Sequence, residues 1–349
     1  MTRIRPSRLL VRLRPFRATH LIALCLSLLA AAPAWAGTAS TDGVFRFEKE
    51  EKLPARPGTR YLFPRAYSTA MVDLAALKTI LAAAPKEGTS AARSNPLVLE
   101  LPMPDGSFQR FAAMESSIME EPLQERFPEI RTYSARGLDD PAASVRFDVT
   151  PWGFHAQILG PGGRVWIDPY RHGDTQNLLV YYTKDYTRTA PRQSCLFDEP
   201  APARPGLAQV TRPSQAPAVP AVAVGTQLRT FRTAVGATGE YTAFYGGTVP
   251  GALAGIVTSI NRITGVYEID LAVRLQLVAS ETNVIFTNPA TDPYTNTVSG
   301  AQLNVNHSTL SAAPPAGIGS ANFDVGHMFT TDPGGGLAGL GVICDNGQK

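Results

Sequence analysis

The sequence contains little charge and few cysteines, and both shortages exclude classes of protein. Charged residues make up 17% of its 349 residues, below the roughly 25% of an average soluble domain, which argues against coiled coils and long charged helices. Three cysteines are too few for a disulfide scaffold. Hydrophobic residues still reach 44%, enough to bury a core, so wholesale disorder is excluded.

The first 36 residues have the pattern of a secretory signal peptide. Residues 1–20 carry six arginines and no acidic residue, residues 21–32 are predominantly apolar, and Ala34-Trp35-Ala36 supplies the small residues of a cleavage site. The apolar run is shorter than the roughly 20 residues of a spanning helix. An uncleaved N-terminal anchor is the alternative. We expect cleavage after Ala36, a secreted extracellular product and no membrane span in the remainder.

Loss of the six leader arginines makes the expected product acidic. Without these six, the 32 basic residues of the chain become fewer than its 29 acidic residues. No basic patch remains to attract nucleic acid, which we do not expect as a partner. The product keeps two cysteines, Cys195 and Cys344. They suffice for one disulfide or one functional thiol in an oxidising compartment.

Residues 37–190 are expected to form a β-rich domain with one helix near its start. Thr69 is the predicted cap of that helix, whose apolar residues Met71, Leu74, Leu77, Ile80 and Leu81 share a face and which ends near Pro85. Period-2 alternation, turn residues and a break at Trp152-Gly153 predict five strands, at residues 97–101, 108–113, 145–149, 154–159 and 165–167. The last three are expected to form an antiparallel meander.

A proline-rich segment, residues 191–226, is the expected linker to a second domain over residues 227–349. Residues 228–235 read as a strand, Thr248 caps a helix that Gly265 ends, and residues 271–277 alternate as a second strand with 284–286 beyond. This order predicts a parallel pair with a helical crossover. The face of the second strand is expected to lack a C-terminal helix that covers it.

Few residues are candidates for chemistry. No two histidines have the spacing of H-E-x-x-H, and no G-x-S-x-G elbow is present. His155 lies on a predicted meander strand and His172 follows the end of its hairpin partner, with Asp168 and Asp174 nearby, so one interpretation is a metal site. Hydrogen-bonded strand histidines are the favoured interpretation. The glycine-rich residues 334–341 lack the G-K-[ST] ending of a phosphate loop.

From residue 228 onward the chain resembles a reprolysin-like (adamalysin-type) zinc metallopeptidase of the metzincin clan. The stretches that carry the resemblance are LRTFRTAV (228–235), GEYTAFYG (239–246), IVTSINRI (256–263), VYEIDL (266–271), LQLV (275–278), NFDVGHMFT (322–330) and GGLAGLGVIC (335–344). LPMPDGSFQR (101–110) and WIDPY (166–170) resemble the propeptide of the bacterial exported branch. The implied fold class is α+β/α/β: a β-rich propeptide domain, then the N-terminal half of a metzincin-like α/β domain with a mixed twisted sheet.

The resemblance implies zinc as cofactor, proteins or peptides as substrates, and a precursor activated by removal of its propeptide. The family's zinc helix, H-E-x-x-H-x-x-G-x-x-H, has no counterpart in this sequence, so no catalytic or zinc-ligating residue is assigned. We expect a fragment of a longer zymogen, inactive as it stands. The alternative is a catalytically inactive exported binding or inhibitory protein with a decayed peptidase domain.

Three further assignments rest on the resemblance. One strand resembles the edge strand along which these enzymes bind an extended substrate: Phe323, Asp324, Val325, Gly326, His327, Met328 and Phe329. Cys195 lies where relatives place a thiol that caps the zinc. A disulfide to Cys344 and an inert thiol remain open for Cys195, and Cys344 is itself expected to pair with a cysteine beyond residue 349.

Overall fold

The computed structural model describes residues 38–187, 227–332 and 335–339. The expected signal peptide, the linker 191–226, Cys195 and Cys344 therefore lie outside the described residues. Within them, no helix has both the length and the apolar character needed to cross a bilayer.

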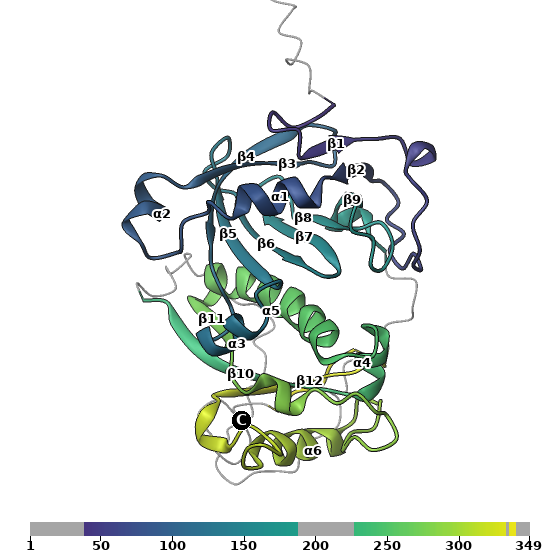
Figure 1. Cartoon of the computed structure of the whole chain (residues 1–349), viewed down its shortest axis with the longest axis vertical. Coiled ribbons are helices and arrows are strands. Elements are labelled where there is room, and N and C mark those ends of the chain that lie inside the picture. Colours follow the sequence, from purple (N-terminus) through teal and green to yellow (C-terminus); the bar gives the residue numbers. More distant parts are fainter. Residues whose placement is uncertain (1–37, 188–226, 333–334, 340–349) are drawn as a thin grey trace, which may run out of the picture. The chain divides into compact units, whose positions relative to one another are not determined.

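Nine antiparallel strands form the larger sheet, in the order β1-β2-β9-β8-β7-β6-β5-β4-β3 (Figure 1). β1 and β3, at the two ends of this order, contact each other, so the sheet is nearly closed. The meander predicted from alternation is confirmed as β6, β7 and β8. The strands are β1 (Phe45–Phe47), β2 (Ser68–Val72), β3 (Leu97–Pro102), β4 (Phe108–Glu115), β5 (Arg131–Gly137), β6 (Ser144–Thr150), β7 (Gly153–Leu159), β8 (Val165–Pro169) and β9 (Asn177–Tyr182).

The sheet encloses a core that we call the first core, made only of side chains between residues 44 and 180. Helix α1 (Leu74–Leu81) contributes Leu77 and Leu81 to it. The prediction that Thr69 caps this helix is wrong, because residues 68–71 pair with β9. Asp73 is the cap, and its side chain accepts hydrogen bonds from the backbone of Ala75 and Ala76. Two short helices, α2 (Ser90–Ser94) and α3 (Glu121–Arg126), lie between strands.

The second part of the chain contains a smaller sheet with the strand order β11-β10-β12. Its strands β10 (Arg229–Ala237), β11 (Val273–Leu277) and β12 (Val325–Phe329) are all parallel, which confirms the predicted crossover. The mixed sheet implied by the resemblance remains a prediction. The helices are α4 (Gly239–Phe244), α5 (Val249–Leu271) and α6 (Gly300–Ser311).

Helix α5 begins as predicted but ends later. Thr248 caps it by accepting a hydrogen bond from the Gly251 backbone. The helix continues through Gly265 to Leu271, so the prediction that Gly265 ends it is wrong. A Cβ at residue 265 would lie 2.8 Å from Cγ of Arg146, so this glycine permits close packing on β6 instead. Residues 281–284, partly expected to be extended, form a 3-10 turn.

A second core joins both parts of the chain. Its buried residues are four side chains from the segment 118–130 and twelve from residues 235–285. β11 is thus covered on its apolar face by α5 and by this segment. The expected exposure of this face is wrong, because elements that precede β11 in the chain cover it in place of a C-terminal helix. The N-terminal residues in this core are Ile118, Met119, Leu123 and Ile130.

Candidate functional site

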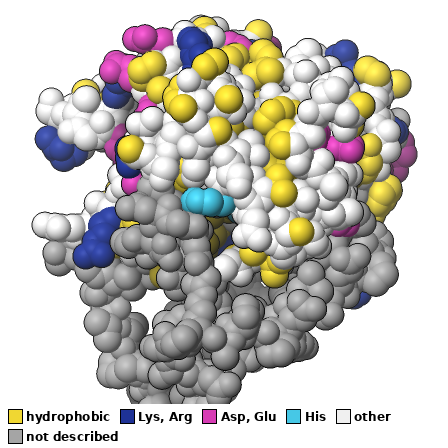
Figure 2. Space-filling model, turned by 90° about the horizontal axis from the view of Figure 1, so that it is seen from below, with side chains coloured by type: hydrophobic (Ala, Val, Ile, Leu, Met, Phe, Trp, Pro, Cys, Tyr) yellow, Lys and Arg dark blue, Asp and Glu magenta, His cyan; other side chains and the backbone are white. Residues whose placement is uncertain are grey.

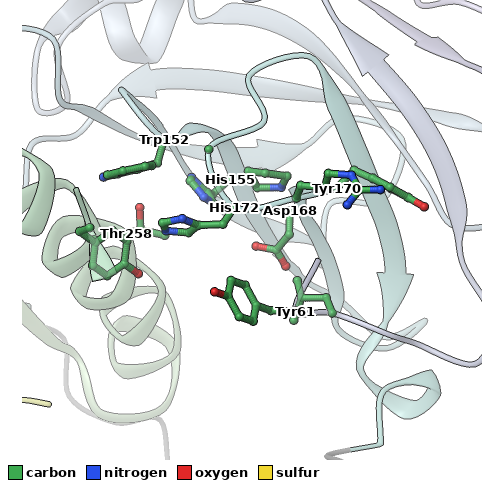
Figure 3. A pocket seen from close by; sticks show the side chains of 13 residues that line it. Tyr61, Trp152, His155, Asp168, Tyr170, His172 and Thr258 are labelled. Carbon is green, nitrogen blue, oxygen red and sulfur yellow. The ribbon is translucent and has the colours of Figure 1, made fainter. Parts of the chain in front are cut away.

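A cavity of about 120 Å³ lies where the large sheet meets α5 and Tyr245, the residue that follows α4 (Figure 3). Trp152 and the strand residues His155 and Asp168 line one side, and Thr258 of α5 lines the other. The volume is well below the roughly 300–1,000 Å³ of small-molecule pockets. The cavity is too small to hold a peptide substrate.

Several polar groups around the cavity bind one another. Nδ1 of His155 lies 3.0 Å from Oδ1 of Asp148, and the Thr258 hydroxyl donates to the same oxygen at 2.9 Å. Asp168 accepts from the Arg262 guanidinium at 2.6 Å and from the Tyr181 hydroxyl. These contacts connect β6, β7 and β8 to α5.

The metal site considered for the two histidines is not formed by the described residues. His155 and His172 do line the same cavity. Asp174, however, accepts hydrogen bonds from Asn177 and from the backbone of residue 176, which fixes a turn. No group of three His, Cys, Asp or Glu that could hold a metal occurs among the described residues. The favoured interpretation, hydrogen-bonded strand histidines, is confirmed for His155.

His172 is packed among aromatic rings from both parts of the chain. Its ring stacks on Trp152 at 4.6 Å and lies 4.4 Å from Phe244 and 5.4 Å from Tyr245. Its Nε2 is buried and has no hydrogen-bond partner among the described residues. Burial, and then the neighbouring His155, lower the pKa of His172 below its ordinary value. Protonation of His172 therefore opposes this packing.

A chain of ion pairs crosses the same contact farther along α5. Arg146 of β6, 3% exposed, pairs with Glu268 of α5 at 2.5 Å. Glu268 also binds Arg274 of β11, which pairs with Glu87 at 2.7 Å. Hydrogen bonds from the Trp152 indole to the Gly251 carbonyl and from Asn261 to the Phe147 carbonyl lie on the same face. This contact between the large sheet and α5 is the best-defined candidate site in the described part of the chain.

The predicted substrate strand, residues 323–329, corresponds to β12 and the two residues before it. β12 pairs with β10 alone among the described strands. Phe323 is fully buried, and Asp324 pairs with Arg232 at 2.7 Å. On the face drawn in Figure 2, charged side chains of both signs lie mainly toward the rim. The role of residues 323–329 in substrate binding stays a prediction.

Comparison with protein families identifies the second part of the chain. Residues 227–349 match the Reprolysin-like metallo-peptidase family M12B. This segment is reprolysin-like. No curated protein matches the chain. The matched segment contains β10, α4, α5, β11, α6 and β12, and the resemblance found in the sequence is thereby confirmed.

A reprolysin-like segment indicates a metallopeptidase, with zinc as the implied metal and proteins or peptides as substrates. The described residues do not fit zinc, because they bring no three ligating side chains together. We assign no chemistry at zinc to them. The described residues of this segment pack against the N-terminal sheet.

Sequence reasoning singled out His155 and Asp168 but missed most residues of this contact. Asp148, Thr258 and Arg262 carry no local motif and belong to strands and a helix more than a hundred residues apart. One signal was present: Gly251, Gly255 and Gly265 recur along α5, where a Cβ would meet Tyr245 or Arg146 within 2.8 Å. Glycines repeated along a helix indicate a closely packed face.

Proposed function

We propose that the chain is the precursor of a secreted, zinc-dependent metalloendopeptidase that hydrolyses peptide bonds through a metal-activated water. Residues 1–36 act as signal peptide, residues 37–190 as propeptide-like domain, and residues 191–226 as the linker in which the precursor is cut. Residues 227–349 are the N-terminal part of the peptidase domain, and the zinc ligands belong to residues beyond 349.

The observation that carries this proposal is the family match of residues 227–349. The contact made by the preceding sheet supports it, because an extensive set of buried ion pairs and hydrogen bonds binds that sheet to the same segment. A domain that precedes a peptidase and packs against it has the arrangement expected of a propeptide. Cys195 as a zinc-capping thiol and Cys344 as a disulfide partner belong to the same proposal.

The coding DNA downstream of codon 349 gives the first test. We expect H-E-x-x-H-x-x-G-x-x-H within roughly 60 codons, the distance expected from the resemblance. Expression of that complete reading frame should then yield a culture supernatant whose peptidase activity is abolished by a zinc chelator and restored by added zinc. N-terminal sequencing of the secreted precursor should begin at Gly37.

Two results would contradict the proposal. One is a stop codon directly after codon 349, together with a secreted product whose intact mass ends at Lys349 and which has no peptidase activity. That outcome would favour the alternative, an inactive exported binding or inhibitory protein. The other is a product that stays in the cell with its leader attached.

A further inference from the structure

The segment that joins β4 to β5 makes an isolated parallel bridge to the small sheet. The Leu277 backbone N–H donates to the Ile118 carbonyl at 2.7 Å, and the Glu120 N–H donates back to the Leu277 carbonyl at 2.9 Å. Met119 thereby pairs with Leu277 in parallel register. This pairing lies along the edge of β11 that faces away from β10, an edge that offers unpaired backbone groups if the segment is removed.

The same segment fixes both ends of that pairing. The Glu120 carboxylate accepts a hydrogen bond from the Ala279 backbone at 2.7 Å, and Arg126 donates to the Ala279 carbonyl. Gln124 ties α3 to the strand that follows, because its amide donates to the Ile130 carbonyl at 2.8 Å. The segment is therefore held in one conformation as it meets β11.

Apolar side chains of the segment fill the second core. Ile118, Leu123 and Ile130 are fully buried and Met119 is 2% exposed, all in one cluster with α5 and β11. None of the four belongs to the first core. Their burial thus depends on contact with the reprolysin-like segment rather than on the fold of the large sheet.

We propose that residues 116–130 are a docking segment. It binds the edge of β11 by strand addition and keeps the large sheet attached, without a covalent link, after the chain between residues 187 and 227 is cut. The partner surface is the outer edge of β11 and the adjoining face of α5. Its role in regulation, retention of the excised sheet on the peptidase, rests on the proposed precursor function. Strand addition of this kind draws affinity from backbone hydrogen bonds and selectivity from side-chain pockets.

The test uses the whole secreted chain with a specific protease site in place of residues 205–212 and an affinity tag at the N-terminus. After complete cutting, the tagged fragment is immobilised and washed, and the retained C-terminal fragment is measured over time. At neutral pH we expect the C-terminal fragment of the cut protein to stay on the immobilised N-terminal fragment as fully as the same residues do in the uncut protein. Prompt loss of the C-terminal fragment from the cut wild-type protein would overturn the proposal.

Variants of Glu120 isolate the strand addition. The backbone φ of Glu120, −58°, is compatible with proline. Glu120→Pro removes both the N–H that donates to Leu277 and the carboxylate. Glu120→Ala removes the carboxylate alone. We expect release of the C-terminal fragment to be at least tenfold faster for Glu120→Pro than for Glu120→Ala. Equal release rates for the two variants would contradict the docking role of the pairing.

A second pair of variants covers the case in which proline disturbs folding. Leu123→Asp places a charge in the second core, while Val98→Asp changes a side chain that is 53% exposed on β3. Only Leu123→Asp should release the C-terminal fragment, with the circular dichroism of the tagged fragment unchanged. Retention equal to that of Val98→Asp would overturn the proposal. The readout needs no peptidase activity, so an inactive enzyme would contradict the proposed function while leaving this result intact.

Discussion

Two of the three hydrophobic cores among the described residues differ in where their residues come from, while the third lies wholly within residues 234–323. The first core draws on residues 44–180 alone, with Phe147 and Phe154 at its centre. The second core takes residues from both parts of the chain, including the docking segment 116–130. The large sheet is therefore self-sufficient in apolar burial, whereas the second core of the reprolysin-like segment is completed by residues of the N-terminal part. Dependence between the two parts runs mainly in one direction.

Separate expression of the two parts should give the largest effect. Residues 37–187 alone should unfold cooperatively, because they retain the whole first core. Residues 227–349 alone lose Ile118, Met119, Leu123 and Ile130 from the second core and expose apolar surface, so we expect loss of cooperative unfolding. Thermal unfolding by circular dichroism and binding of a hydrophobic dye measure this. A cooperative transition of residues 227–349 in isolation would mean that the second core does not need the docking segment.

Removal of one buried charge should give the next largest effect. Arg146→Ala removes the partner of Glu268 from β6, although Glu268 keeps Arg274, and should lower the free energy of unfolding of the whole chain by about 1–3 kcal/mol. Urea denaturation of residues 37–349 provides the measurement.

The double variant Arg146→Met/Glu268→Met is the matched control. It removes both charges and should recover most of the loss, because apolar side chains then replace the buried pair and Arg274 keeps Glu87. Arg146→Ala should have a much smaller effect on residues 37–187 alone, since its partner Glu268 is absent there. A similar loss in that fragment would show that Arg146 supports the large sheet itself.

The effect of pH on retention of the C-terminal fragment should be smaller than the effect of Arg146→Ala and should occur in two steps. Burial lowers the pKa of His172 from its ordinary 6.5, so its contribution is complete above pH 6.5 and is lost as the pH falls through the lowered pKa. For Glu87, burial opposes ionisation, but hydrogen bonds from Arg274 and Ser116 outweigh it and lower the pKa below 4.5. Its contribution is complete above pH 4.5 and is lost in more acidic solution. Retention of the cut fragments should therefore fall first with His172 and later with Glu87.

Two variants separate these steps. His172→Phe keeps the aromatic packing with Trp152 and Phe244 and should abolish the first step. Glu87→Gln weakens the pairing with Arg274 at neutral pH and should flatten the second step. Retention measured from pH 7.5 down to about pH 2.5 tests both. An unchanged first step in His172→Phe would assign it to another group.

How far the sequence predicted the fold depended on whether a signal was local. Alternation within β6, β7 and β8 and the β10–α5–β11 crossover are local patterns, and both were predicted. Thr69 was misassigned because its strand is stabilised by β9, over a hundred residues away. Gly265 was misread because glycine both ends helices and permits close packing. Thr258 and Asp148 meet only in the folded chain, so no local pattern could place them together.

The smallest effects should come from the helix caps, and these compare the two regions directly. Asp73 caps α1 and Thr248 caps α5, each by accepting backbone hydrogen bonds. Replacement of either by alanine should cost about 1 kcal/mol. Asp73→Ala should lower the stability of residues 37–187 and of residues 37–349 alike, because α1 packs only in the first core. Thr248→Ala should lower the stability of the longer chain only, and should speed release of the cut C-terminal fragment, because α5 contributes to the second core and contacts β6. Urea midpoints of residues 37–187 and of residues 37–349 measure the effects on stability. The retention assay measures the effect on release of the C-terminal fragment. If Asp73→Ala speeds release as much as Thr248→Ala does, the two cores are coupled in both directions.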